Sequence, residues 1–357
     1  MKRVIALVAT IVALCPFLSG CDFWMTGDYL SVTPHEPYQE LNSETVVEVS
    51  SYQQLRNALS DLVNNCAEKG IISIRSFSHA TVDYYVNTAI NFVKKSTALG
   101  AYAVENITYE IGTKRSASVV AFEIEYCHTR AEILGIHNVQ NTEEMIGAIT
   151  NALDNSEVYL ALHSESYEAL DFIQLVQDYT NEHPDIVIEL PKVVVFTYPE
   201  RGSERIIELT FTYQTERENL RKMQERVAEV FTSAELYVKE STQVKDIYSR
   251  LYSFLMERND YTLQTSITPS YSLLQHGVGD SRAFANVYAA MCRRAGLDCS
   301  VVSGTRDANP WCWNLVRYRG KYYHVDLLRC SANDEFVMLT DSDMADYVWD
   351  YSAYLGS

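Results

Sequence analysis

Alternating apolar and polar residues mark two β-rich runs, each with a polar turn at its centre. The first run is 103–126 and the second is 190–213, and they align without a gap at a shift of 87 residues. Period-two alternation around a polar turn predicts a β-hairpin in each run. A fixed shift between two such runs indicates an internal repeat.

The segments before the two hairpins match as well. The run 71–77 falls on 158–164 at the same shift of 87, and with three residues dropped the helical run 51–65 falls on 141–155. Each copy therefore predicts a helix, a strand, a helix and a hairpin. Because two copies are too few for a solenoid, we expect two packed α+β modules. Their predicted bounds are residues 46–135 and 136–215.

From about residue 216 the pattern becomes helical, with apolar residues three to four positions apart in 216–237 and 241–262. A further helix is expected near residue 280, and short strands follow it. Arg319-Gly320 predicts a two-residue turn between two of these strands. The predicted fold class is therefore α+β throughout, with a third unit at 216–357.

The first twenty residues have the pattern of an export signal, with Lys2 and Arg3 before an apolar run that is too short to span a bilayer. The segment Leu18-Ser19-Gly20-Cys21 resembles the lipobox of bacterial lipoproteins, in which the cysteine is acylated and the preceding peptide removed. The resemblance implies an extracytoplasmic protein held to the lipid bilayer through Cys21. An ordinary signal peptide with Cys21 merely nearby is the alternative. Residues 21–45 have no sustained periodicity and predict a flexible tether.

The formal charge is -18, and removal of Lys2 and Arg3 with the signal peptide makes it -20. A strongly acidic surface repels phosphate backbones and anionic lipid, which argues against a nucleic-acid partner and leaves the acyl group on Cys21 as the only expected membrane contact. Neither module has a phosphate-binding loop or clustered metal-ligand residues, so no metal or cofactor is expected. The two modules are therefore predicted to be structural or partner-binding.

Six of the eight cysteines remain once Cys15 is removed and Cys21 acylated, and they lie outside the reducing cytosol. Cys66 and Cys127 occur together in the first copy of the repeat and are absent together from the second, which favours a disulfide between them. Further candidate pairs are Cys292 with Cys299 and Cys312 with Cys330.

Residues 240–345 resemble the bacterial transglutaminase-like domain, a relative of the papain-fold cysteine proteases. The resemblance rests on the order of the segments and most specifically on Trp313-Asn314 and Tyr323-x-x-Asp326. In that family a cysteine opens a helix, a histidine stands two residues before the Trp-Asn pair, and an aspartate ends the YxxD strand. The three positions in this chain are Ser281, Trp311 and Asp326.

Two of these three roles are vacant. A serine hydroxyl needs a neighbouring base to become nucleophilic, and an indole has no basic nitrogen. We therefore expect a catalytically degenerate domain that binds protein or peptide at the cell envelope. The alternative is an active hydrolase or transamidase in which His324 serves as the base for Ser281 and Asp326 orients it.

Overall fold

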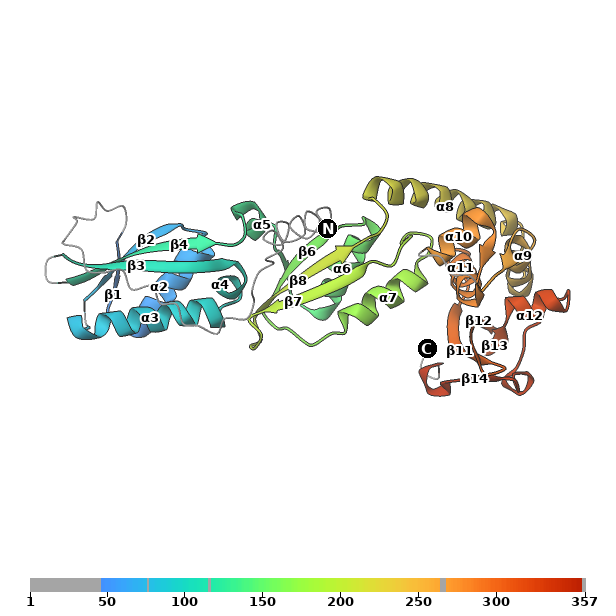
Figure 1. Cartoon of the computed structure of the whole chain (residues 1–357). Helices are drawn as coiled ribbons and strands as arrows, with labels where there is room; N and C mark the ends of the chain where they lie inside the picture. The colour runs from blue at the N-terminus through green and yellow to red at the C-terminus, as the bar shows by residue number, and fades with distance from the viewer. Residues whose placement is uncertain (1–45, 76, 115–116, 264–267, 355–357) are drawn as a thin grey trace, which may run out of the picture.

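The computed structural model of the chain describes residues 46–354 except for 76, 115–116 and 264–267. The predicted signal peptide, lipobox and tether lie outside the described residues. Figure 1 shows the described elements as three bodies in a row, in chain order. Among the described residues, no helix is long and apolar enough to cross a membrane.

The first module packs two long helices against one face of a four-stranded sheet with strand order β1-β2-β4-β3. Its first long helix starts where the Ser51 side chain accepts a hydrogen bond from the Gln54 backbone N–H. That helix buries Leu55 and Leu59. The elements are β1 (Val47–Val49), α2 (Tyr52–Asn64), β2 (Lys69–Ile74), α3 (His79–Ser96), α4 (Ala98–Ala103), β3 (Val104–Lys114) and β4 (Ala117–Tyr126).

The second module has the same strand order, β5-β6-β8-β7, with the first pair parallel and the other two antiparallel, as in the first sheet. Its core helix is also capped by a polar side chain, since Asn141 accepts from the Glu144 N–H. The elements are α5 (Arg130–Leu134), β5 (His137–Val139), α6 (Thr142–Asp154), β6 (Tyr159–Ser164), α7 (Phe172–Glu182), β7 (Lys192–Tyr198) and β8 (Arg205–Thr212).

The strand pairing corrects one step of the predicted alignment. Ile72 lies opposite Val120 in the first sheet, and Leu162 lies opposite Ile207 in the second. The inner strand is therefore displaced by 90 residues and its hairpin partner by 87. The two displacements differ by three residues, and a shift by an odd number of residues moves every side chain to the other face of a sheet. A displacement of 87 would therefore match the buried Ile72 with the exposed Tyr159.

The C-terminal domain, described from Arg217 to Tyr354 except for residues 264–267, combines a group of helices with a four-stranded sheet ordered β13-β12-β11-β14. The predicted turn at Arg319-Gly320 is confirmed, because both residues have positive φ and join β12 to β13. The elements are α8 (Arg217–Val238), α9 (Val244–Met256), β9 (Asp260–Tyr261), α10 (Pro269–His276), β10 (Val278–Gly279), α11 (Ser281–Arg294), β11 (Cys299–Arg306), β12 (Asn309–Tyr318), β13 (Lys321–Val325), α12 (Leu327–Ala332), η2 (Asp341–Asp343), β14 (Tyr347–Trp349) and η3 (Tyr351–Tyr354).

Side chains from neighbouring bodies pack together at both junctions. Between the two modules, Tyr102 and Ala103 of α4 share a buried cluster with Ala161 and Ile206 of the second sheet. At the other junction, the Gln224 side-chain amide on α8 donates hydrogen bonds to two backbone carbonyls of the second module. The three bodies are thus joined by specific contacts as well as by the chain.

Candidate active site

Helix α11 runs through the centre of the C-terminal domain, and eleven of its fourteen residues are buried. Asp280 caps the helix by accepting a hydrogen bond from the Ala283 N–H at 2.8 Å. Ser281 is the first helical residue and is 8% exposed. Its Oγ accepts a hydrogen bond from the Cys312 backbone N–H at 3.2 Å, which links the start of α11 to β12.

Trp311 and Asp326, the other two positions, meet directly. The Trp311 indole Nε1 donates to Asp326 Oδ2 at 2.9 Å. The same oxygen accepts from the Tyr347 hydroxyl at 2.6 Å and from the Arg306 guanidinium at 3.4 Å. Asp326 Oδ1 caps α12 by accepting the N–H groups of residues 328 and 329. Asp326 is 1% exposed, and both of its oxygens are occupied.

The charge of this buried carboxylate is balanced by Arg306, whose side chain is 30% exposed. The guanidinium also lies over the rings of Trp311 and Tyr347, at 5.4 and 5.6 Å from their centroids. Burial raises the pKa of Tyr347 well above its ordinary value, and the neighbouring Asp326 raises it further. Tyr347 therefore stays protonated and donates to the carboxylate.

His324 has other partners. Its Nδ1 accepts from the Trp313 indole at 2.9 Å, and its Nε2 lies 3.0 Å from an Asp341 carboxylate oxygen. Because an indole N–H can only donate, Nδ1 is the acceptor and Nε2 carries the proton. Burial lowers the pKa of His324, although the Asp341 contact acts in the opposite direction. The ring is a neutral, buried link between β13 and the segment that follows α12.

The alternative triad of Ser281, His324 and Asp326 is therefore not assembled. Cys312 and Asn314 on β12 face α11, as the bond from the Asn314 side chain to the Ala285 carbonyl shows. Trp313 and His324 pack together on the opposite face. Among the described residues, no imidazole is hydrogen bonded to the Ser281 hydroxyl. The prediction failed because a shared strand face does not fix which partners a side chain meets.

A comparison with protein-family models matches residues 232–327 to the transglutaminase-like superfamily. These residues include α11 and all three positions described above. The chain contains a transglutaminase-like domain. No curated protein matches the chain.

Two solved structures show remote similarity to this chain. One is a crystal structure of a TGase, with 12% sequence identity and a TM-score of 0.27; the match covers 54% of this chain and 59% of that one. The other is a candidate cysteine protease from Cytophaga hutchinsonii, also with 12% identity and a TM-score of 0.27, over 44% of this chain and 70% of that one. This chain thus spans little more than half of the first structure.

The described cysteines are all free thiols. The predicted Cys66–Cys127 disulfide is wrong in this structure, because the Cys127 thiol points to the backbone carbonyls of residues 102 and 103 at the end of α4. Cys292 and Cys299 are also unbridged and are buried in the core of the transglutaminase-like domain. Burial raises the pKa of Cys292 well above its ordinary value, which makes it a poor nucleophile.

The remaining two cysteines, Cys312 and Cys330, are not paired with each other either. The Cys312 sulfur lies 3.6 Å from the Ser303 hydroxyl. Cys330 contacts the backbone of Val337, and burial raises the pKa of its thiol to about 11. In the described part of the chain, no group of three His, Cys, Asp or Glu residues is arranged to hold a metal ion.

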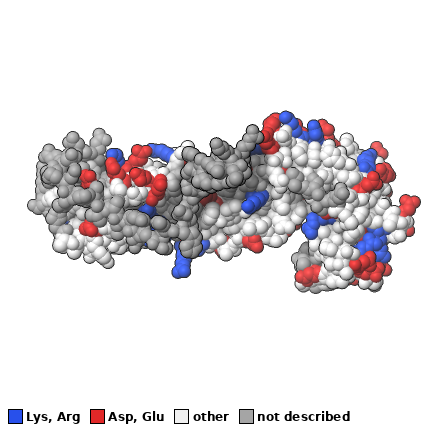
Figure 2. Space-filling view, in the orientation of Figure 1, with Lys and Arg blue, Asp and Glu red and all other residues white. Residues whose placement is uncertain are grey.

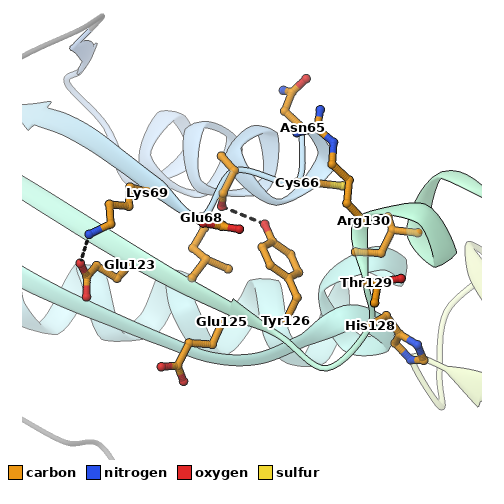
Figure 3. Close-up of a pocket in the computed structure, with 13 residues that line it drawn as sticks. Asn65, Cys66, Glu68, Lys69, Glu123, Glu125, Tyr126, His128, Thr129 and Arg130 are labelled. Atoms are coloured by element: carbon orange, nitrogen blue, oxygen red, sulfur yellow. Dashed lines mark hydrogen bonds and ion pairs between the residues drawn. The ribbon is translucent and has the colours of Figure 1, made fainter.

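A polar groove of about 860 Å³ lies outside the transglutaminase-like domain, where the first module meets α5. Figure 3 shows that Lys69 and Glu123, paired on the neighbouring strands β2 and β4, form an ion pair of 2.5 Å in its lining. The Tyr126 hydroxyl donates to the Ala67 carbonyl beside them. Sequence reasoning missed this groove, because its lining comes from three separate segments, 65–69, 123–126 and 128–133, with no shared pattern.

Proposed function

We propose that this chain is an extracytoplasmic lipoprotein whose transglutaminase-like domain has lost thiol chemistry and whose work is to bind protein or peptide at the cell envelope. The observation that carries the proposal is the hydrogen bond from the Trp311 indole to Asp326. In the family pattern this carboxylate would orient a catalytic imidazole. Here it is held by an indole, which cannot accept a proton from a nucleophile.

The surroundings of Ser281 support the same proposal. Its hydroxyl is bonded to a backbone N–H, and both oxygens of Asp326 are occupied by other donors. The field of a helix N-terminus is worth about 0.3 to 1 kcal/mol, which is far too little to ionise an alcohol. Without a base, Ser281 has the properties of a buried structural residue.

Exposed apolar residues on the second sheet support a binding role. Val194 and Phe196 of the edge strand β7 are 38% and 55% exposed, and they lie on the face away from helices α6 and α7. Tyr159 on β6 lies on the same face, beside the part that α4 covers, and its hydroxyl is hydrogen bonded to that of Tyr102. An edge strand with an apolar open face suits the addition of an extended polypeptide segment. The common strand order of the two sheets also supports their origin as an internal repeat.

The export pattern of residues 1–21 supports the envelope location. An apolar run with cations before it and Leu18-Ser19-Gly20-Cys21 after it suits acylation at Cys21. The diacylglyceryl group of such lipoproteins carries two acyl chains, which suits stable retention at a bilayer.

The catalytic part of the proposal is tested by restoring the missing groups. Purified chain is assayed for amine incorporation into casein and for casein hydrolysis, beside Ser281→Ala, Ser281→Cys, Trp311→His and the double variant Ser281→Cys/Trp311→His. We expect no activity in the natural chain. The double variant should react with iodoacetamide at position 281 faster than Ser281→Cys, because the introduced imidazole would stabilise the thiolate while Asp326 orients the ring. Turnover by the natural chain that disappears in Ser281→Ala would overturn the proposal.

The binding part is tested by site-specific crosslinking in the cell. A photoreactive residue is placed at Phe196 and, as a matched control, at Leu236 of α8, which is 62% exposed. We expect position 196 to yield a discrete crosslinked envelope protein and position 236 to yield none. Equal crosslinking from both positions, or from neither, would argue against a binding face on β7.

A further inference from the structure

The turn between β12 and β13 presents a run of cations and tyrosines to solvent. We call residues 317–322 the basic hairpin tip; within it Arg317, Arg319 and Lys321 are all exposed. The two guanidinium groups lie near aromatic rings, with Arg319 5.1 Å from the centroid of Tyr318 and Arg317 5.9 Å from that of Tyr322. The tip contains no acidic residue. It therefore combines three positive charges with two rings in six residues.

The backbone of the tip has a residue that the turn does not favour. A two-residue turn with positive φ at both positions prefers Asn-Gly or Asp-Gly, because other L residues are strained there. Gly320, at φ 75°, fits this rule, whereas Arg319 adopts φ 51° with a long charged side chain.

The charge of the tip differs from that of the rest of the chain. Residues 46–215 contain 11 Lys and Arg against 23 Asp and Glu, whereas residues 216–357 contain 16 against 19. Figure 2 shows acidic and basic side chains interspersed over the visible face of the C-terminal domain. The one ion pair at the tip joins Arg317 to Asp298 at 3.9 Å, with both side chains more than half exposed, so it is weak.

We propose that the basic hairpin tip is a docking site for the anionic headgroups of a phospholipid bilayer. Cations attract acidic headgroups, while tyrosine rings favour the boundary between headgroups and acyl chains. Nucleic acid fits the observations less well, because it is held by many phosphate contacts and the tip offers only three cations. The tip would supply a second membrane contact, and it does so whether or not Cys21 is acylated.

The test uses the mature chain, residues 21–357, with Cys21→Ser so that no acyl chain contributes. Sedimentation is measured with vesicles of phosphatidylcholine alone and of phosphatidylcholine mixed with phosphatidylglycerol. We expect binding to the anionic vesicles only, and weaker binding as salt is raised. The variant Arg319→Asn/Lys321→Gln should bind roughly 25-fold more weakly, at about fivefold for each charge.

The control Arg221→Gln/Lys222→Gln removes two exposed charges from α8 and should bind as the natural chain does. Because asparagine suits the turn better than arginine, Arg319→Asn/Lys321→Gln should unfold at an equal or higher temperature, so its loss of binding cannot be ascribed to misfolding. Equal binding to both vesicle types, or equal loss in the two variants, would overturn the proposal. Binding to polyglutamate without binding to anionic vesicles would also overturn it and would indicate an acidic protein partner.

Discussion

Asp326 should be one of the most sensitive positions for the stability of the C-terminal domain. Asp326→Ala removes the cap of α12, which costs about 1 kcal/mol. It also leaves the buried donors of Trp311 and Tyr347 without an acceptor, at about 1 to 3 kcal/mol each. Part of this destabilisation is offset, because the Arg306 side chain can turn toward solvent once its partner carboxylate is removed. We expect the free energy of unfolding to fall by roughly 3 to 5 kcal/mol.

The measurement is urea unfolding followed by tryptophan fluorescence, because three of the four tryptophans lie in the C-terminal domain. Asp171→Ala is the matched control, since Asp171 caps α7 through one backbone N–H and should lose only about 1 kcal/mol. Asp326→Asn should fall between the two, because its oxygen can still cap α12 while its amide faces two other donors. If Asp326→Ala lowered the free energy of unfolding no more than Asp171→Ala, the hydrogen bonds from Trp311 and Tyr347 to Asp326 would not contribute to stability.

Three further predictions concern other parts of the chain. Radiolabelled palmitate should enter the protein in a bacterial host, and Cys21→Ala should abolish the label. Because burial lowers the pKa of His324 below the unfolded value of about 6.5, the unfolded state takes up a proton first as the pH falls. Stability should therefore decline as pH falls through about 6.5, and His324→Gln should flatten that slope in urea titrations at several pH values. Native alkylation should modify Cys127 and Cys66 before the four buried cysteines, with no disulfide found by non-reducing peptide mapping.

Local features of the sequence predicted local structure well. The alternation in 103–126 predicted the hairpin of β3 and β4, and Arg319-Gly320 predicted a turn. Both depend on residues adjacent in sequence, where side-chain period and turn chemistry decide the outcome. The order of segments around Trp313-Asn314 indicated the transglutaminase-like domain, and the family match at 232–327 confirms that assignment.

Features that depend on distant residues were not predictable in this way. Nothing near Asp326 in the sequence identifies Arg306 and Tyr347 as its partners, because they come from β11 and β14 and meet only when the sheet forms. The orientation of the His324 ring was unpredictable for the same reason, since Trp313 and Asp341 fix it from two different segments. Pattern reasoning gives the face of a strand but not the contacts on that face.

The pair of substitutions at 281 and 311 has a common physical logic. A buried carboxylate must keep hydrogen-bond donors, so a residue that replaces histidine near Asp326 needs an N–H, and tryptophan supplies one at 2.9 Å. Under the proposed loss of the base and the proposed envelope location, a cysteine at the first turn of α11 would keep a lowered pKa and would be prone to oxidation. Serine has nearly the same shape as cysteine, its hydroxyl accepts a hydrogen bond from the Cys312 N–H, and it avoids that reactivity. Under the proposed loss of the base, serine in place of the thiol would therefore be advantageous, while Asp326 retains its hydrogen-bond donors.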